Sequence, residues 1–392
     1  MNPGVRRRTA DLACRALQVA LPPSLRSWGW AVRCETAGIP EDTKALLFAL
    51  DSLCGLLPRA TAIRLCALFA LLTGDDVPHS KGLVVMSSFT SAVRRPLTVG
   101  IACSIGAVFL GFVYMAIAGA PLRYLAINAG ALAVGLIMLI VAARAGRKGA
   151  GWSSGLIAAM SAALLGTALL GHSADGATRW LMIGGLALQP SLILLPVMVM
   201  TFARSSTVLG TVGMLVAAAA LALQPDRAMT GMLAAGLATL AMLRADRFVA
   251  TALAASIVGF IVTLMRPDTL PAAPFVDQIL YSAFDVHALA GVAVALGAVL
   301  LLLPAILGRI YDAANLEIYL VFGALWVAAV AAAALGNYPT PIVGYGGSAI
   351  IGYVLSLAAL PKRATAQPRM EARSLGGADV EPGDHHMRLG LA

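Results

Sequence analysis

The chain of 392 residues carries little charge. Asp, Glu, Lys and Arg make up 12% of it and hydrophobic residues 59%, whereas soluble globular proteins contain about 25% charged residues. This imbalance excludes an ordinary soluble domain and predicts an integral membrane protein. The net charge is +9, but no basic stripe with interleaved aromatic residues appears. The positive charge therefore favours contact with anionic lipid headgroups over nucleic acid binding.

Several chemical signatures are also missing. The sequence has no HExxH, no Gly-rich phosphate loop and no Ser-His-Asp arrangement, so it requires no metal or cofactor, although a divalent cation stays compatible with it. The His385-His386 pair lacks partner ligands and is expected to be solvated. An odd number of cysteines without a CxxC pair favours a reduced, cytosolic N-terminal region. All lie in the first third: Cys14, Cys34, Cys54, Cys66 and Cys103.

Residues 1–90 mix charged and apolar residues at helical spacing and are interrupted by prolines. They predict an N-terminal cytosolic segment of short amphipathic helices. Arg15 interrupts the first apolar stretch, which argues against a signal peptide. The run Ala60–Thr73 is short of the roughly 20 residues that span a bilayer, so a position on the membrane surface is favoured and a true span stays open. Residues 361–392 predict a disordered cytosolic tail.

Residues 97–360 form a membrane domain of long apolar runs separated by short polar loops. Each run is long enough, or nearly so, to cross about 30 Å of hydrocarbon as a helix. We therefore expect an all-α, polytopic membrane protein with about ten transmembrane helices. The runs are 98–118, 124–143, 153–171, 184–203, 206–223, 228–243, 247–265, 279–308, 315–336 and 342–360.

The basic residues set the orientation of these runs. Most fall in alternate loops, and the other loops hold only Arg123, Arg179, Arg227 and Arg266. The positive-inside rule places the Lys- and Arg-rich loops, and both chain ends, in the cytosol. The rich loops hold Arg144, Arg147, Lys148, Arg204, Arg244, Arg247, Arg309, Lys362 and Arg363.

Carboxylates are scarce in the middle of the apolar runs. Each would cost about 2.5–3.5 kcal/mol near a helix centre. An ion-driven transporter is expected to carry such carboxylates, so their scarcity speaks against one. Any chemistry is instead expected at the outer membrane surface, where five of the eight acidic residues of this domain fall: Asp175, Asp226, Asp268, Asp277 and Asp285.

Three polar segments stand at the outer ends of the runs. Residues 174–191 read ADGATRWLMIGGLALQPS, residues 224–226 read QPD, and residues 337–350 read NYPTPIVGYGGSAI. In this order and at these spans they resemble the motifs of the SEDS family (shape, elongation, division and sporulation), the FtsW/RodA/SpoVE-like membrane proteins of cell division and cell shape. The resemblance covers about residues 97–360 and marks the chain as a divergent member.

The resemblance implies a peptidoglycan glycosyltransferase that polymerises lipid II, a disaccharide-peptide on an undecaprenyl pyrophosphate carrier, at the outer face of the bacterial cytoplasmic membrane. Implied partners are this lipid-linked sugar, membrane lipids and a transpeptidase or divisome protein. Arg179 offers a planar fork for pyrophosphate. The substrate-binding residues implied are Arg179, Trp180, Gln189, Ser191, Gln224, Asp226, Asp285, Tyr345, Gly346, Gly347 and Ser348, with Pro190, Pro225 and Pro341 also matching the motifs.

The resemblance also places a catalytic carboxylate on Asp277. The eighth span opens with DQILYSAFD, which resembles the family's DFIFAxxGEE-like stretch. Asp277 then takes the place of the Asp that acts on the acceptor sugar hydroxyl, and Asp285 that of the first Glu. Eight residues are a little over two helical turns, so the two carboxylates are expected on one helix face, about 12 Å apart along the axis.

The chain departs from the family pattern at several places. Leu192 and Leu195 stand where the family has Glu and Lys, and Arg227, Ala228 and Met229 follow QPD in place of Gly-Thr. The outer loop between spans seven and eight is cut to about 266–278. A catalytically impaired relative that binds a lipid-linked sugar or a division partner, and a lipid-linked sugar transporter, therefore stay as alternatives.

Simpler structural roles are open for the motif residues too. Arg179 and Trp180 are both residue types that anchor a chain at the membrane interface. Gly346 and Gly347 suit a close helix contact. Asp226 is a favourable cap for the sixth helix.

The topology can be tested with reporter fusions. Fusions after Arg147 and after Arg363 are expected to report the cytosol, and a fusion near Pro271 the outer side, because basic loops stay inside. A cytosolic signal at Pro271 would overturn both the orientation and the proposed outer site.

Overall fold

The structure is a computed structural model that describes residues 3–22, 25–53, 55–56, 95–144, 149–174, 176–266 and 270–361. The predicted surface segment Ala60–Thr73 and the predicted tail beyond Pro361 lie outside the described residues.

The N-terminal part forms helices, as its residue spacing predicts. Helix α1 (Pro3–Ala20) packs against α2 (Arg26–Gly38), and residues 42–53 are helical as well. Leu17, Leu21 and Val32 are buried in a small hydrophobic core of their own. The guanidinium group of Arg7 donates to the carbonyl groups of Ala37 and Ile39 at the end of α2, a favourable place for a positive charge.

Apolar helices make up most of residues 96–359, so the all-α fold class is confirmed. Six are long and apolar enough to cross a membrane, and four further apolar helices of the described residues are shorter. The helices are α5 (Pro96–Ile117), α6 (Leu122–Arg144), α7 (Ala150–Leu170), α8 (Pro190–Arg204), α9 (Val208–Leu223), α10 (Arg227–Leu243), α11 (Arg247–Leu264), α12 (Ile279–Val286), α13 (Ala288–Tyr311), α14 (Leu316–Leu335) and α15 (Gly347–Ser356), with short 3₁₀ turns at Ala313–Asn315 and Leu357–Ala359.

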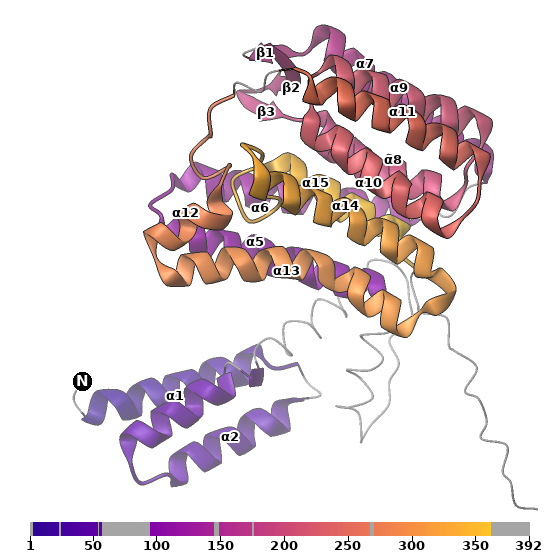
Figure 1. Cartoon of the computed structure of the whole chain (residues 1–392). Helices are drawn as coiled ribbons and strands as arrows, with labels where there is room; N and C mark the ends of the chain where they lie inside the picture. Colours follow the sequence, from indigo (N-terminus) through magenta and orange to yellow (C-terminus); the bar gives the residue numbers. More distant parts are fainter. Residues whose placement is uncertain are drawn as a thin grey trace, which may run out of the picture.

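The helices fall into two adjoining groups. One contains α7 to α11, and the other contains α5, α6 and α12 to α15 (Figure 1). The contacts of α10 with α14 and of α8 with α15 join the groups. A shared core of buried side chains, including Trp326 and Tyr353, lies between them. The loops at one end of both groups carry the predicted outer residues.

Three predicted runs are wrong in their boundaries. The eighth run, 279–308, is broken at His287, whose extended backbone separates α12 from α13. The imidazole Nδ1 of His287 accepts the N–H of Leu289 at 3.1 Å, which caps the new helix. The tenth run, predicted from residue 342, becomes helical only at Gly347.

The fourth run differs as well, because its first residues form a β-hairpin. Strands β1 (His172–Ala174), β2 (Ala177–Ile183) and β3 (Leu186–Leu188) make an antiparallel sheet in the order β1-β2-β3. Gly184 and Gly185 turn the chain with φ of 58° and 79°, a geometry that glycine adopts at little cost. Helix α8 therefore begins only at Pro190, whose missing N–H is not needed in a first turn.

The two helix groups approach closely where α15 crosses α8. A Cβ atom on Gly352 would lie 2.0 Å from the carbonyl oxygen of Leu192. Backbone cannot yield as a flexible side chain can, so this position accepts only glycine. The same holds at Gly111 of α5, where a Cβ would lie 2.5 Å from the carbonyl oxygen of Val343.

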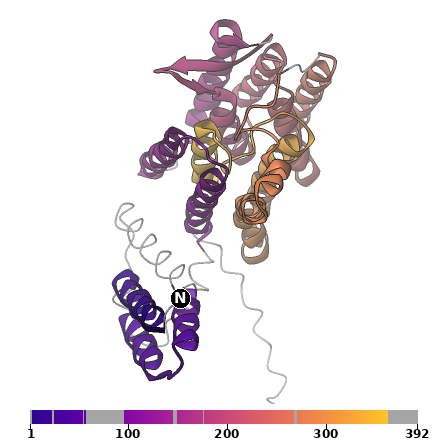
Figure 2. The ribbon, with the colours of Figure 1, turned by 90° about the vertical axis from the view of Figure 1, so that its left-hand side faces the viewer.

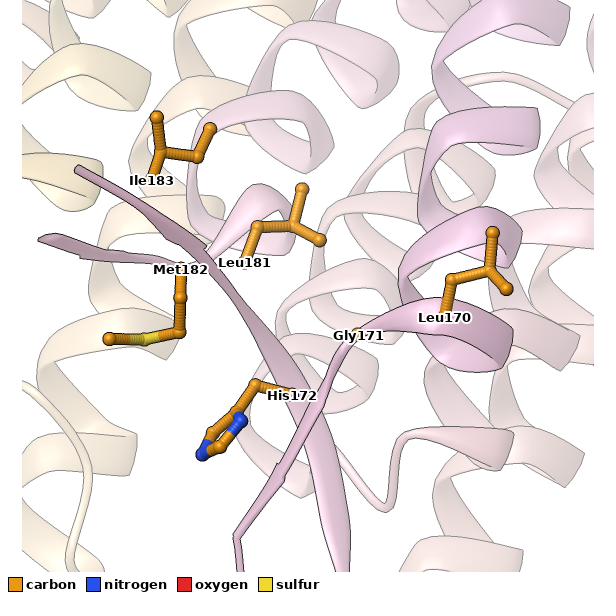
Figure 3. Close-up of a pocket in the computed structure, with 6 residues that line it drawn as sticks. All are labelled: Leu170, Gly171, His172, Leu181, Met182 and Ile183. Atoms are coloured by element: carbon orange, nitrogen blue, oxygen red, sulfur yellow. The ribbon is translucent and has the colours of Figure 1, made fainter. Parts of the chain in front are cut away.

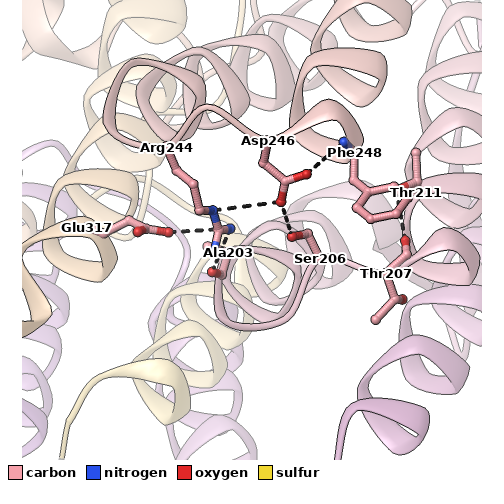
Figure 4. Close-up of polar contacts among 8 residues, drawn as sticks. All are labelled: Ala203, Ser206, Thr207, Thr211, Arg244, Asp246, Phe248 and Glu317. Carbon is pink, nitrogen blue, oxygen red and sulfur yellow. Dashed lines mark hydrogen bonds and ion pairs between the residues drawn. The ribbon is translucent and has the colours of Figure 1, made fainter.

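A polar network connects the loops at the opposite, predicted cytosolic end (Figure 4). Arg244 lies 3.4 Å from the carboxylate of Glu317 on α14 and 3.9 Å from that of Asp246, and donates to the carbonyl of Ala203. Asp246 accepts hydrogen bonds from the Ser206 hydroxyl and the Phe248 N–H. The Ser206 hydrogen bond lowers the pKa of the Asp246 carboxyl. These contacts join α8, α10, α11 and α14 at this end.

The crossing of α15 on α8 predicts the effect of a single methyl group. Gly352→Ala is expected to destabilise the protein by about 1–3 kcal/mol because the Cβ forces the helices apart. Gly130→Ala on α6, where a Cβ meets nothing within 4 Å, is the matched control and should be neutral or stabilising. Thermal unfolding in detergent compares the two, and equal behaviour of both variants would contradict the tight crossing.

Candidate functional site

A buried carboxylate, Asp226, lies at the centre of the first cluster of motif residues. Its Oδ2 accepts hydrogen bonds from Gln189 Nε2 at 3.0 Å and from Ser191 Oγ at 2.9 Å. Its Oδ1 accepts from the N–H of Met229 at 3.3 Å, as an N-cap of α10 does. The side chain of Asp226 is fully buried. The first and second motif segments, 174–191 and 224–226, thus meet at this group.

Arg179 joins the same cluster from strand β2. Its guanidinium group donates to the carbonyl groups of Gln224, at 3.5 Å, and of Pro225. It also lies over the ring of Tyr338, 5.9 Å from the ring centroid. The residue is only 4% exposed. Gln224 in turn donates from its Nε2 to the carbonyl of Leu164 on α7.

The last motif reaches the cluster through Ser348. The Ser348 hydroxyl accepts the N–H of Gln189 at 2.9 Å. Gln189 precedes α8, and Ser348 lies in the first turn of α15. Most motif residues therefore stand at helix ends, where backbone groups lack partners within their own helix. Side chains of one segment satisfy the helix ends of another.

A second group forms where the loop before α12 pairs with residues 337–346. Asp277 lies opposite Pro339 in an antiparallel bridge, and the N–H of Thr340 donates to the carbonyl of Val276 at 2.9 Å. The N–H of Tyr345 donates to the carbonyl of Phe275 at 2.7 Å. The carboxylate of Asp277 accepts the N–H of Ala273 at 2.8 Å, and the residue is partly exposed. The outer loop is thus held on the third motif.

Asn128 of α6 holds the third motif by hydrogen bonds, and the sequence analysis did not identify it. Its side chain donates to the carbonyl of Gly344 at 2.9 Å and accepts the N–H of Gly346 at 3.2 Å. The residue is fully buried. A lone amide within an otherwise apolar run was the available signal, because buried polar groups in a membrane helix need partners.

An aromatic group covers the same motif. The rings of Tyr124 and Tyr345 stack with centroids 3.9 Å apart, and Phe275 meets Tyr124 edge-on at 6.0 Å. Arg123 lies over the ring of Tyr124. Burial, with the neighbouring Tyr124, raises the pKa of Tyr345. The stack therefore gives the Gly346-Gly347 turn a rigid, largely apolar wall.

Backbone strain occurs at Pro225 of the first group, which has a φ of 31°, and at three residues of the second. Phe275, Gln278 and Ile342 have φ values of 63°, 58° and 68°, which residues other than glycine rarely adopt. Such strain costs on the order of 1–3 kcal/mol per residue and gathers at functional sites. It marks the contact between the outer loop and the third motif as the candidate site.

The two groups meet along one segment. Tyr338 contacts Arg179, and the next residue, Pro339, pairs with Asp277. Ser348 closes the other end against Gln189. Residues 337–348 of the third motif therefore contact the first motif and the predicted catalytic loop, and the second motif is joined to them through Arg179 and Gln189.

The expected helical pair of carboxylates is not formed. Asp277 precedes α12 and is separated from it by Gln278 in a left-handed conformation, while Asp285 lies exposed near the end of α12. The two therefore do not share one helix face, because the helix covers only the later part of the stretch. Trp180 follows Arg179 on β2, where it pairs with His172 of β1.

Two of the departures from the family pattern, Leu192 and Leu195, are apolar core positions. Leu192 is 6% exposed and Leu195 fully buried, so neither place offers a charge to a ligand. Within the described residues no group of three or more His, Cys, Asp or Glu side chains is arranged to hold a metal ion.

The chain resembles solved structures of the rod shape determining protein RodA from Thermus thermophilus. An aspartate-to-alanine variant of that protein matches with 20% identity and a TM-score of 0.48, over 66% of this chain and 94% of that one. Its unsubstituted form matches with 18% identity and a TM-score of 0.46, over 66% and 93%. No protein-family model matches the chain, and neither does any curated protein.

The Asp226 cluster predicts a stability effect. Asp226→Asn keeps the shape but replaces one acceptor oxygen by a donor, which then faces the donors Gln189 and Ser191. We expect a loss of about 1–3 kcal/mol in the free energy of unfolding. Asp285→Asn, at an exposed position, is the control and should change it little. Thermal unfolding with equal midpoints for both variants would show that the cluster is not stabilising.

Proposed function

We propose that the chain is a divergent SEDS family member that polymerises lipid II into glycan strands at the outer face of the bacterial cytoplasmic membrane, in cell division or cell shape control. The observation that carries the proposal is that residues 337–348 of the third motif contact the first motif and the Asp277 loop, while the first motif is bonded to Asp226 of the second. Sequence motifs far apart in the chain have no reason to meet at one strained backbone unless they form one site.

Asp277 is the proposed catalytic base. It is partly exposed at the end of the bundle that the basic loops place outside. Its carboxylate would take the proton of the acceptor sugar hydroxyl while that oxygen bonds to the anomeric carbon of the growing chain and the pyrophosphate leaves. The Ala273 N–H and the pairing with Pro339 hold the carboxylate in place, so little ordering is needed in the transition state.

The remaining motif residues divide by exposure. Gln189, Ser191, Gln224 and Asp226 are buried and bonded to one another or to backbone, which suits positioning of the site. Tyr345, Gly346 and Gly347 are partly exposed and are the proposed substrate contacts beside Asp277. Arg179 would reach a pyrophosphate only by leaving the carbonyl groups of Gln224 and Pro225.

A second candidate function is a relative that binds a lipid-linked sugar or a transpeptidase or divisome partner without turning it over. The buried Leu192 and Leu195 favour it, since they remove two charges that the family pattern has beside QPS. The buried position of Arg179 favours it as well. In its lipid-binding form the second candidate shares the lipid-linked ligand of the first, and this form is the one tested below.

Lipid II polymerisation by purified protein distinguishes the candidates. If Asp277 is the base, Asp277→Asn should lower the rate by about 10²–10⁴-fold, whereas Asp285→Asn, exposed and beyond the loop, should cost much less. The two variants change the same chemical group at nearby positions, and matched thermal unfolding ensures that both are folded.

Each outcome of this assay bears on one or both candidate functions. Activity that survives Asp277→Asn would remove this residue from catalysis. A wild-type protein without activity that still binds lipid II would support the second candidate, and one that does neither would contradict both.

A further inference from the structure

The β2–β3 hairpin ends in an apolar tip. Residues 180–188 read WLMIGGLAL and include no charged side chain. Met182 is 54%, Ile183 57% and Leu186 38% exposed. On a water-facing loop such a tip would leave a contiguous apolar patch in solvent. This exposure would cost about 25 cal/mol of free energy for each Å² of apolar surface. The hairpin therefore needs an apolar environment.

The surface of α7 continues onto this hairpin. Strand β1 follows α7 almost directly, and the last residues of α7, Leu169 and Leu170, are 69% and 85% exposed. Because α7 is long and apolar enough to span a membrane, these side chains face lipid near the end of the span. The sheet extends sideways from this end of the bundle (Figure 2), along the direction of a membrane surface rather than away from it.

A cavity lies in the angle between the helix end and the hairpin. Its volume is about 510 Å³, within the range of about 300–1,000 Å³ of small-ligand sites. Figure 3 shows the side chains of Leu181, Met182 and Ile183 on the hairpin, with Leu170 across from them. The remaining lining residues are Gly171 and His172. The cavity is open to the outside, and apart from His172 its polar lining comes from the backbone, while the side chains of Leu170, Leu181, Met182 and Ile183 are apolar and suit a hydrocarbon chain.

We propose that the hairpin is a membrane-interface anchor whose apolar tip reaches the acyl chains of the outer leaflet, and that a phospholipid acyl chain occupies this cavity. The paired residues Leu181 with Leu188, Met182 with Ala187 and Ile183 with Leu186 satisfy much of the backbone of the tip. The strand edges keep unpaired groups and so lie at headgroup depth while the side chains point into hydrocarbon. His172, exposed at the rim, lies at the same polar level.

This inference rests on membrane insertion and not on the proposed glycosyltransferase activity. Continuity with the lipid-facing end of α7 selects a lipid chain over a protein partner as the occupant. An anchor here would hold β2, and with it Arg179 and its contacts to Gln224 and Pro225, at a fixed depth beneath the membrane surface.

Site-directed spin labelling tests the depth of the tip. Single cysteines are introduced into the full chain after its native cysteines are replaced, labelled with a nitroxide and reconstituted in phosphatidylethanolamine–phosphatidylglycerol vesicles. Ile183→Cys reports the tip, and Leu186→Cys repeats the measurement on the partner strand. Val258→Cys on α11, 61% exposed, is the lipid-facing control, and Ser173→Cys on β1, also exposed, is the water-facing control.

Oxygen concentrates in hydrocarbon and a nickel chelate stays in water, so their collision rates with the label order the positions by depth. We expect the labels at 183 and 186 to collide more often with oxygen than with the chelate, as the label at 258 does. The label at 173 should collide more often with the chelate than with oxygen. Labels at 183 and 186 that behave like 173 would overturn the anchor.

The occupant of the cavity is tested by fluorescence. Leu181→Cys carrying a small fluorophore should be quenched when the vesicles contain phospholipids with brominated acyl chains, compared with unbrominated vesicles. The water-facing Ser173→Cys label should keep its brightness in both. Equal brightness at 181 in the two kinds of vesicle would overturn the assignment of an acyl chain to the cavity.

Discussion

The hydrogen bonds to the carboxylate of Asp226 hold together parts of the chain that are far apart in sequence. Gln189 and Ser191 donate to it from the start of α8, and it caps the start of α10 by accepting the N–H of Met229. Hydrogen bonds to a charged group contribute about 1.5–3 kcal/mol, and a buried carboxylate without them would be costly. The first turns of α8 and α10 are thereby fixed, and Arg179 is held next to them through the carbonyl groups of Gln224 and Pro225.

From this fixed cluster the arrangement extends to the candidate site. Ser348 ties the start of α15 to Gln189, and the preceding segment carries Tyr338 against Arg179 and Pro339 against Asp277. Asn128 supports the segment from α6. In a catalytic or binding site, supporting residues are expected to hold the reacting group in place. Here a buried polar cluster lies beside a partly exposed carboxylate on strained backbone, which agrees with that expectation.

The sequence predicted much of this arrangement for identifiable reasons. Long apolar runs indicate helices well because a backbone in lipid must form its hydrogen bonds within the segment. Ten apolar helical regions could therefore be placed. The hairpin at 172–188 was missed because WLMIGGLAL is as apolar as a helix end, and only Gly184-Gly185 indicated a turn. The break at His287 was missed because a capping histidine is not visible as a helix signal in an apolar run. Asn128 was missed because a buried amide is recognised by its partners, which lie more than 200 residues away in sequence.

The most direct test of the central claim, that the motif residues form one interacting cluster, is a double-mutant cycle on Ser191 and Asp226. Ser191→Ala, Asp226→Ala and the double variant are unfolded in mixed micelles, and the coupling energy is taken from the four free energies of unfolding. The account predicts a favourable coupling of about 1 kcal/mol or more, because each residue contributes only while the other is present. Strictly additive effects would contradict it and leave the motifs as independent structural features.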